Sequence, residues 1–430
     1  MTASLKPLRT PVLVSNKKKR VYETLTGLLE TALVAAVLLF LIANRGVLHA
    51  EEQERKLTLI IIGDAGEKGS ELRANATLVT KMHREEHDGG VFDGMVFLGD
   101  NFYDTGLNVP LRDLNGKIRS VLDPFEVPML DLGRGNVHAI AGNHDYYARY
   151  ALDASALFGL ISIEEGPVGL TDRGNEREKA IDLWTYYYNM PAEVCYPLVD
   201  GGKDSVQLVF FDSARLLRTQ PKTWHRSLDS LKTILRVSGK RPGIIWRFLM
   251  VHHPLHTVGE HGGYSIWNDE TNRVDYLTQC DKDSNAIGWF KNLIDPEDLC
   301  AERYRQYADS LRGAIRHSGA KIQALFSGHD HSLQLLDRPE ETVDCPECPE
   351  VHIVSGAGSS VSLVRLPQPP RDFTAVDPEE EGRSIAGFVQ LMLDRERARV
   401  VFFGGASGER IDMGGGRTEF WIDSAGKLVP

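Results

Sequence analysis

From residue 57 onward the chain repeats one pattern: a short β-branched or apolar run, a turn, and then a polar or helical stretch. Short apolar runs bounded by turn residues predict β-strands. The strands are expected at 57–62, 95–98, 137–141, 206–211, 248–251, 322–326, 351–355, 388–393 and 400–403, with helices at 70–87, 224–237 and 304–317. Strands that alternate with helices favour a layered α/β fold in which helices cover the sheets.

Five of the expected strands end in tight turns that present side chains able to bind a metal ion. They are Gly63-Asp64, Gly99-Asp100-Asn101, Gly142-Asn143-His144-Asp145, His252-His253 and Gly328-His329-Asp330-His331. In open α/β sheets, ligands bind at the carboxyl ends of the strands, so these turns are expected to converge on one place. One such turn alone would more often be purely structural, and the prediction rests on the five together.

The residue types in these turns indicate the metals and the chemistry. Asp carboxylates, an Asn amide oxygen and several His imidazoles form a mixed nitrogen and oxygen set that suits Fe, Zn or Mn better than Ca. A carboxylate that bridges two cations about 4 Å apart lets one metal activate water while both hold a phosphoryl group in line. The turns therefore predict a dinuclear centre for phosphoryl chemistry.

The ordered motifs resemble a known family. GDAG (63–66), GDNFYDTG (99–106), GNHD (142–145), VHHP (251–254) and GHDH (328–331) resemble the calcineurin-like metallophosphoesterases. Tyr103 and the segment HHPLHTVGEHG (252–262) resemble the purple acid phosphatases among them, particularly the small tartrate-resistant type. The resemblance covers residues 57–403 and implies a four-layer α/β/β/α sandwich of two mixed sheets flanked by helices.

The same resemblance implies two sets of metal ligands. Fe(III) is expected to bind Asp64, Asp100, Tyr103 and His331, and a divalent Fe, Zn or Mn ion is expected to bind Asp100, Asn143, His252 and His329. Asp100 then bridges the two ions. His252 is preferred to His253 because the family's ligand lies two positions before the proline that matches Pro254. A Tyr103 phenolate bound to Fe(III) would give a purple colour.

By this resemblance the protein is an acid phosphatase that hydrolyses phosphomonoesters by attack of a metal-bound hydroxide. A trivalent ion lowers the pKa of its bound water steeply, so activity is expected in mildly acidic solution. His144 and His261 match positions that face the substrate in the family, and they are the expected catalytic residues. Either could give a proton to the leaving group.

Two other functions remain open from the sequence. The same metal site could serve a phosphodiesterase or nucleotide hydrolase, against which Tyr103 argues. A non-catalytic, membrane-tethered phosphate-binding protein is disfavoured because all seven expected ligands are present. The segment 264–300, rich in Asn and Asp, departs from the family and is a candidate lid or substrate wall.

The N-terminus carries a targeting or anchoring signal. A basic segment, 1–24, precedes an apolar stretch at 25–43, a combination that indicates export or anchoring with the basic end in the cytoplasm. Leu48 lies where a small residue would be needed for cleavage after Ala50, which favours an uncleaved transmembrane anchor over a signal peptide. Residues 44–56 are then a linker, and the catalytic domain lies outside the cytoplasm, or is secreted or periplasmic if cleavage occurs.

Charge and cysteine content narrow the partners further. The net charge is −11, and residues 1–20 hold six cations and no acid, so the rest of the chain is more acidic still. A chain this acidic repels nucleic acid, and the expected partner is a small phosphorylated substrate.

Cys345 and Cys348 form a single CxxC, which favours a local disulfide or two thiols over a zinc site. The pairing of Cys280 and Cys300, the oligomeric state and the role of the glycine-rich tail, 404–430, stay open.

Overall fold

A computed structural model gives the fold of the protein. It describes residues 56–85, 92–104, 106, 111–149, 185–186, 191–198, 203–262, 266–268, 273–275, 298–299, 301–380 and 382–430. All of them belong to one compact unit, 54–430. The expected anchor at 25–43 lies outside the described residues. Within those residues, no helix combines the length and apolar character that a membrane crossing requires.

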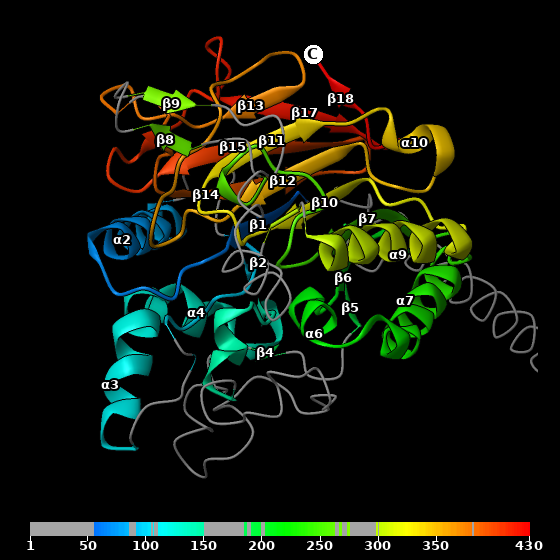
Figure 1. The fold of residues 1–430 in the computed structure, drawn as a ribbon, viewed down its shortest axis with the longest axis horizontal. Coiled ribbons are helices and arrows are strands. Elements are labelled where there is room, and N and C mark those ends of the chain that lie inside the picture. Colours follow the sequence, from blue (N-terminus) through cyan, green and yellow to red (C-terminus); the bar gives the residue numbers. More distant parts are fainter. Residues whose placement is uncertain are drawn as a thin grey trace, which may run out of the picture. The chain divides into compact units, whose positions relative to one another are not determined.

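Two mixed sheets form the centre of the unit (Figure 1). The first contains β1 (Leu57–Ile62), β2 (Gly94–Phe97), β3 (Val137–Ala139), β4 (Thr185–Tyr186), β14 (Gly387–Leu393), β15 (Arg397–Gly404), β16 (Glu409–Arg410), β17 (Glu419–Asp423) and β18 (Leu428–Val429). Its order is β18-β17-β15-β14-β1-β2-β3-β4, with β16 paired to β15. Strands β1 to β4 are parallel, and the strands on the other side of β1 are antiparallel.

The second sheet contains β5 (Ala192–Pro197), β6 (Ser205–Phe210), β7 (Ile244–Met250), β10 (Ala324–Ser327), β11 (Leu333–Asp337), β12 (Val351–Ser355) and β13 (Asp372–Thr374). Its order is β13-β11-β12-β10-β7-β6-β5. Strands β6, β7, β10 and β12 are parallel, and the flanking strands are antiparallel. A separate hairpin, β8 (Ile266–Asn268) and β9 (Arg273–Asp275), lies within the 264–300 segment.

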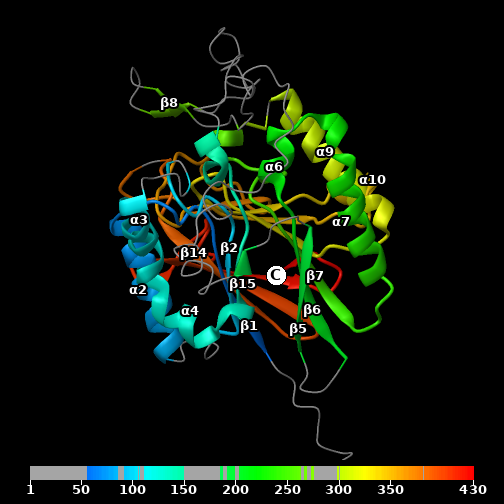
Figure 2. The ribbon, with the colours of Figure 1, turned by 90° about the horizontal axis from the view of Figure 1, so that it is seen from below.

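Helices cover the outer faces of both sheets, as Figure 2 shows. Beside the first sheet lie α2 (Ser70–Glu85), α3 (Leu111–Leu122) and α4 (Glu126–Leu132), and beside the second lie α6 (Ser213–Arg218), α7 (His225–Ser238) and α9 (Glu302–Ser318). A short helix, α10 (Glu341–Asp344), precedes β12. The four layers expected from the resemblance are therefore confirmed.

The layers follow from the alternation of side chains along buried strands. In β1, Leu59 and Ile61 face the second sheet and pack with residues such as Phe248, whereas Ile60 and Ile62 face the helices beside the first sheet. Alternate residues of a strand point to opposite faces, so a strand covered on both sides is apolar throughout. Burying each such side chain contributes about 1.5–3 kcal/mol to the stability of the folded chain. The buried strands therefore hold in place the polar turns that follow them.

Two segments differ from the sequence expectation or extend it. The stretch 365–383, whose four prolines and acidic run at 379–381 predict a solvated loop, includes the buried strand β13. The tail, 404–430, continues the first sheet, because β17 pairs with β15 and β18 pairs with β17. The remaining expected strands and helices are all present. The bounds of 57–62 and 351–355 agree with β1 and β12, the helix expected at 70–87 starts as α2 does and its last two residues lie outside the described residues, and the other elements have shifted ends.

Candidate active site

Topology brings the five polar turns together. Strands β1, β2 and β3 are parallel neighbours in one sheet, and β7 and β10 are parallel neighbours in the other. Each turn follows the carboxyl end of one of these strands, so the turns of each sheet lie at one edge of that sheet. Hydrogen bonds join the two edges, since His252 lies 2.8 Å from the carbonyl oxygen of Leu98 through Nδ1.

The backbone is strained at three of the expected ligands. Asp64, Asp100 and His329 have φ angles of 54°, 50° and 71°, and among the described residues they are the only non-glycine residues with positive φ. The left-handed conformation costs roughly 1–2 kcal/mol for an L-residue, and such strain concentrates at functional sites. Each of the three directly follows a glycine at the end of a strand.

Two glycines of the polar turns, Gly142 and Gly328, have no room for a side chain. A Cβ atom on Gly142 would lie 2.2 Å from Oδ1 of Asp100, and one on Gly328 would lie 2.4 Å from Oδ2 of Asp64. The carboxylates therefore pack directly against the backbone of neighbouring turns. Backbone N–H groups hold them there: His144 donates to Oδ1 of Asp100 at 2.7 Å, and His329 donates to Oδ2 of Asp64 at 2.7 Å.

The expected Fe(III) ligands form one cluster around Tyr103. Its hydroxyl oxygen lies 2.9 Å from Oδ1 of Asp64 and 3.0 Å from Oδ2 of Asp100. The same oxygen lies 2.8 Å from Nε2 of His331. Donor atoms from four residues thus meet at one point, although three different turns supply them.

The other expected ligands form an adjoining cluster around Asn143. Its Oδ1 atom lies 2.9 Å from Nε2 of His252 and 3.2 Å from Nδ1 of His329. Nε2 of His252 also lies 3.4 Å from Oδ2 of Asp100. Asp100 contacts members of both clusters, which is the position that a bridging ligand requires.

His252 and His253 are neighbours in sequence but make different contacts. Because Nδ1 of His252 faces the Leu98 carbonyl, that nitrogen carries the proton and Nε2 is directed at Asn143 and Asp100. His253 lies on the other side, with Nδ1 3.0 Å from Oγ of Ser213. Its ring remains close to that of His329, with centroids 4.3 Å apart, and His252, His253 and His329 could together hold an ion.

The two expected catalytic histidines flank the ligand clusters. The ring of His144 lies against Tyr103, with centroids 4.3 Å apart, and its Nδ1 is 2.8 Å from the backbone oxygen of Asp104. The ring of His261 stacks on His329, with centroids 4.1 Å apart and planes inclined by 24°. Both rings are therefore placed beside the expected metal ligands, one at each cluster.

This geometry agrees with a comparison against known families. The family model of the calcineurin-like phosphoesterases matches residues 57–333, which is more than half of the chain. The chain belongs to the calcineurin-like phosphoesterase family. The match includes all five turns, so every expected ligand lies inside the family domain. No curated protein matches the sequence.

Solved structures resemble the chain at low sequence identity. "GAP50 the anchor in the inner membrane complex of Plasmodium" is 14% identical, with a TM-score of 0.50, over 83% of this chain and 87% of that chain. A purple acid phosphatase from yellow lupin (Lupinus luteus) seeds is 13% identical, with a TM-score of 0.45, over 86% of this chain and 54% of that chain. The structure of PhoD is 10% identical, with a TM-score of 0.46, over 87% of this chain and 72% of that chain.

The charges of the site fit the metals that this phosphoesterase family binds. Asp64 and Asp100 are buried, and in the described part of the chain they form ion pairs with His331 and His252 but none with Lys or Arg. Buried carboxylates need compensating positive charge, which a cation supplies. Burial and the charge of Asp100 raise the pKa of Asp145 to about 7, a further sign of concentrated negative charge.

Several supporting contacts escaped the sequence prediction. The carboxylate of Asp145 accepts hydrogen bonds from the backbone N–H of Gly142 at 2.9 Å and from the Asn101 side chain at 3.0 Å, tying together two of the polar turns. Oγ of Ser360 lies 3.0 Å from Nδ1 of His331. The signal for Ser360 was the segment GAGSS (356–360), which follows an expected strand like the other turns but carries no metal-binding side chain.

A second supporting contact concerns His261. Its Nδ1 atom lies 3.1 Å from Oδ1 of Asp298, and the backbone N–H of Leu299 donates to the His261 carbonyl at 2.9 Å. Residues distant in sequence therefore hold both the ring and the backbone of His261. No sequence pattern marked Asp298, because an isolated Asp in a polar segment has no recognisable spacing.

Proposed function

We propose that this phosphoesterase is an acid phosphatase that hydrolyses phosphomonoesters at a dinuclear metal centre. The observation that carries the proposal is the meeting of Tyr103 with Asp64, Asp100 and His331 within 3.0 Å of its hydroxyl oxygen. A tyrosine oxygen placed among two carboxylates and an imidazole suits a trivalent ion better than a second divalent one. This supports the phosphatase over a phosphodiesterase or nucleotide hydrolase.

The ligands divide between two ions. Fe(III) would be held by Asp64, Asp100, Tyr103 and His331, and divalent Fe, Zn or Mn would be held by Asp100, Asn143, His252 and His329. When bound, the two ions would activate a water molecule and neutralise charge on the phosphoryl group. The protein fixes the ligands in advance, through the strained turns and through the hydrogen bonds from backbone N–H groups.

The remaining chemistry falls to the protein's own side chains. His144 and His261 are within reach of a phosphate held at the two clusters, and each is fixed through Nδ1, so Nε2 can face the substrate. From there, Nε2–H can donate to a phosphate oxygen or give its proton to the departing alkoxide. Asp298 holds the His261 ring in that orientation.

The proposal includes the cellular setting. The basic segment 1–24 would stay in the cytoplasm, the apolar segment 25–43 would anchor the chain in the membrane, and the catalytic domain would act on small phosphorylated molecules outside the cytoplasm. Membrane fractionation and N-terminal sequencing test this. Recovery of a soluble chain that starts near Glu51 would show a cleaved signal and a secreted or periplasmic enzyme.

The decisive experiment measures phosphate release by the metal-loaded full chain from p-nitrophenyl phosphate and from bis(p-nitrophenyl) phosphate between acidic and neutral pH. We expect monoester hydrolysis at acidic pH that a chelator removes and that the His252→Ala variant lacks. Faster cleavage of the diester would identify a phosphodiesterase instead. A folded, metal-loaded chain that hydrolyses neither ester would favour a non-catalytic role.

A further inference from the structure

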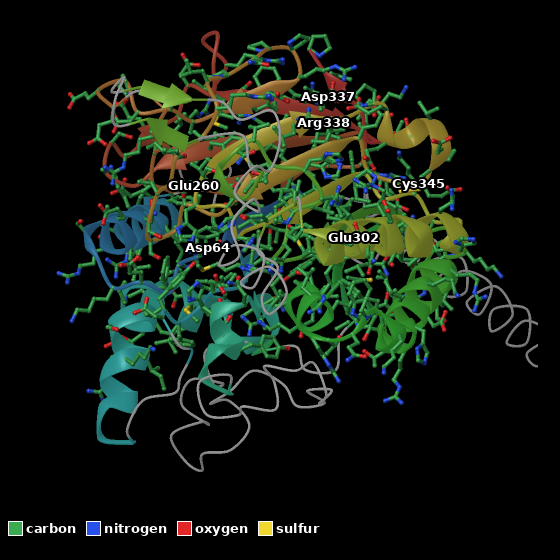
Figure 3. All side chains as sticks on the ribbon, viewed as in Figure 1. Asp64, Glu260, Glu302, Asp337, Arg338 and Cys345 are labelled. Carbon is green, nitrogen blue, oxygen red and sulfur yellow. A yellow bond between two sulfur atoms is a disulfide. The ribbon has the colours of Figure 1, made fainter. Side chains whose placement is uncertain are left out.

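The Cys345–Cys348 disulfide lies apart from the active site. Figure 3 shows Asp64 near the middle of the described unit and Cys345 near its α10 edge. The two cysteines form a disulfide across three positions of sequence and pack in the core beneath α9. Their exposure differs: Cys348 is 0% exposed, and Cys345 is 5% exposed.

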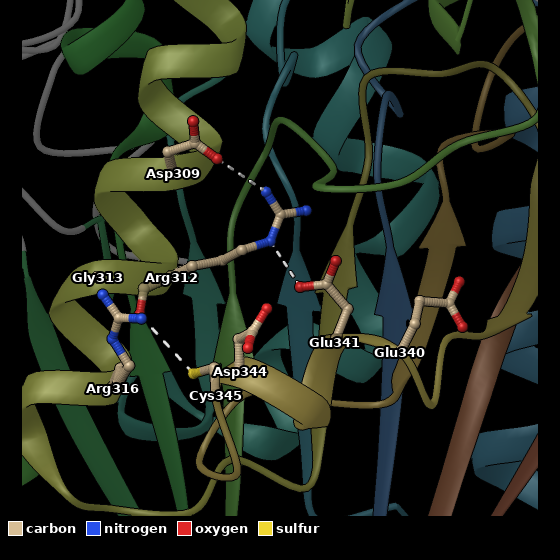
Figure 4. Close-up of a pocket in the computed structure, with 8 residues that line it drawn as sticks. All are labelled: Asp309, Arg312, Gly313, Arg316, Glu340, Glu341, Asp344 and Cys345. Atoms are coloured by element: carbon tan, nitrogen blue, oxygen red, sulfur yellow. Dashed lines mark hydrogen bonds and ion pairs between the residues drawn. The ribbon is translucent and has the colours of Figure 1, made fainter.

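The disulfide contacts α9 at Arg312. The Sγ atoms of both cysteines lie 3.9 Å from the backbone oxygen of Arg312. The Arg312 side chain then reaches α10, where its Nε donates to Oε2 of Glu341 at 2.5 Å (Figure 4). Glu341 is four residues before Cys345, so the disulfide closes the turn that directly follows this ion pair.

The segments before and after this turn both contact His256. Oε1 of Glu341, on the arm before the disulfide, lies 2.7 Å from Nε2 of His256. The ring of His352, on the arm after it, packs edge-on against the His256 ring, with centroids 4.7 Å apart. Cys348 precedes His352 by four residues, so the disulfide lies along the chain between the two groups that contact His256.

His256 belongs to the loop that carries the active-site histidines. It lies four residues after His252 and five before His261. The loop continues directly into buried contacts, because the Thr257 hydroxyl donates to Oδ2 of Asp330 at 2.6 Å and the Val258 N–H donates to the Gln334 side chain at 2.9 Å. Asp330 lies between the expected ligands His329 and His331. A displacement of His256 would therefore be transmitted to both ends of the site.

A cavity gives access to one of the two sulfur atoms. It has a volume of about 450 Å³, lies between α9 and α10, and is lined by charged residues of both helices and by Cys345 (Figure 4). Cys348 does not line it. A small dithiol, or a thiol-bearing loop of a reducing protein, can thus enter the cavity that Cys345 lines.

We propose that Cys345–Cys348 is a thiol-exchange site that controls the position of the 252–262 loop through Glu341 and His256. A dithiol reductant supplies the electrons: its thiolate attacks Sγ of Cys345, the disulfide bond breaks, and Cys348 leaves as a thiolate that takes up a proton. The second thiol of the reductant then displaces Cys345. Two protein thiols and one oxidised reductant result, a balanced two-electron exchange.

The test treats the folded full chain with graded dithiothreitol and follows thiol alkylation and backbone hydrogen exchange by mass spectrometry. We expect the Cys345–Cys348 disulfide to open, the more exposed Cys345 to be alkylated faster than Cys348 once both thiols are free, and exchange to quicken in residues 254–261. Cys195, the free cysteine of the described residues, provides the matched control: Cys195→Ser should respond to dithiothreitol as the unaltered chain does. A disulfide that resists reduction in the folded chain, or one that opens with unchanged exchange in 254–261, would overturn the proposal.

Two variants separate the disulfide from effects of the reductant on the metals. Cys345→Ala/Cys348→Ala should show the faster exchange without any reductant and no further response to it. Glu341→Gln should quicken exchange in 254–261 with the disulfide intact, which keeps the test open if the double variant fails to fold. In both, KM for a phosphomonoester should rise about three- to tenfold, the scale of one lost hydrogen bond. This last arm rests on the proposed function, whereas the exchange measurements decide the inference even in a chain without phosphatase activity.

Discussion

The hydroxyl oxygen of Tyr103 lies 2.8 Å from Nε2 of His331, although 228 positions of sequence separate the two residues. Burial and the charges of Asp100 and Asp64 raise the pKa of Tyr103 well above its ordinary value. Among carboxylates alone the phenol would therefore keep its proton. Tyr103 becomes a phenolate only where added positive charge outweighs the carboxylates, which makes this oxygen a sensitive reporter of a trivalent ion.

The Tyr103→Phe variant should lose the visible absorption band and bind Fe(III) more weakly, because the substitution removes an oxygen ligand and keeps the ring. We expect the loss of affinity to be at least the roughly 10- to 100-fold typical of removing a group next to a metal ligand. Absorption spectra and iron content during dialysis measure both effects. Tyr196→Phe removes a hydroxyl 2.7 Å from His138 in the core and should leave the band unchanged. A Tyr103→Phe protein as purple as the unaltered chain would refute the assignment.

The Gly142→Ala variant should disrupt the metal centre through sterics alone. The added Cβ would lie 2.2 Å from Oδ1 of Asp100, so the expected bridging carboxylate must move. We expect the variant to fold but to lose most of its bound metal and its hydrolytic activity, measured by elemental analysis and phosphate release. Gly116→Ala in α3 meets no atom within 4 Å and should stabilise the helix by roughly 0.5–1 kcal/mol. Full metal content in Gly142→Ala would contradict the crowding seen here.

Sequence patterns located the strands that carry the site, since each is an apolar run that ends in a turn. They missed strands whose buried positions are polar. In β11, Gln334 is buried and bonded to Thr257, Ser332 and the Val258 backbone, so a polar residue interrupts the apolar run of the strand. In β13, Asp372 is buried because Arg338 pairs with it at 2.7 Å, although the strand lies in a proline-rich stretch that predicts a solvated loop. Such strands depend on partners from other parts of the chain.

The candidate site shows the same limit. The five turns could be found because metal-binding side chains directly follow strand ends. Residues that act on those side chains from elsewhere could not, and Asp298, which contacts His261, is the clearest case. Contacts between distant segments have no local signature.

Stability should fall in the acidic range because of His138. Burial lowers the pKa of His138 to about 4, whereas an unfolded histidine titrates near 6.5. Between these values the unfolded chain binds a proton that the folded chain does not, so the free energy of unfolding declines as the pH falls from 6.5 towards 4. The decline attributable to this ring is about 2–3 kcal/mol at pH 4.5.

The His138→Gln variant tests this directly. Urea unfolding at pH 7 and at pH 4.5 should show a difference in free energy that is about 2–3 kcal/mol smaller than in the unaltered chain. His225→Gln, at the exposed start of α7, should leave the difference as it is, because that ring stays in contact with water. An identical pH dependence in His138→Gln would mean that other groups govern acid stability.

The contact between His261 and Asp298 predicts how activity depends on the leaving group. An alkyl phosphate releases a strongly basic alkoxide that needs a proton, whereas a dinitrophenyl phosphate releases a stable anion that does not. His261→Ala should therefore lower kcat by about 10²-fold for the alkyl ester and by much less for the dinitrophenyl ester. Asp298→Asn should show the same selectivity with a smaller loss, since it removes the acceptor that orients the ring. His317→Ala, on the exposed side of α9, should affect neither substrate. Equal losses for both esters in His261→Ala would assign the ring to phosphate binding, with His144 left as the proton donor.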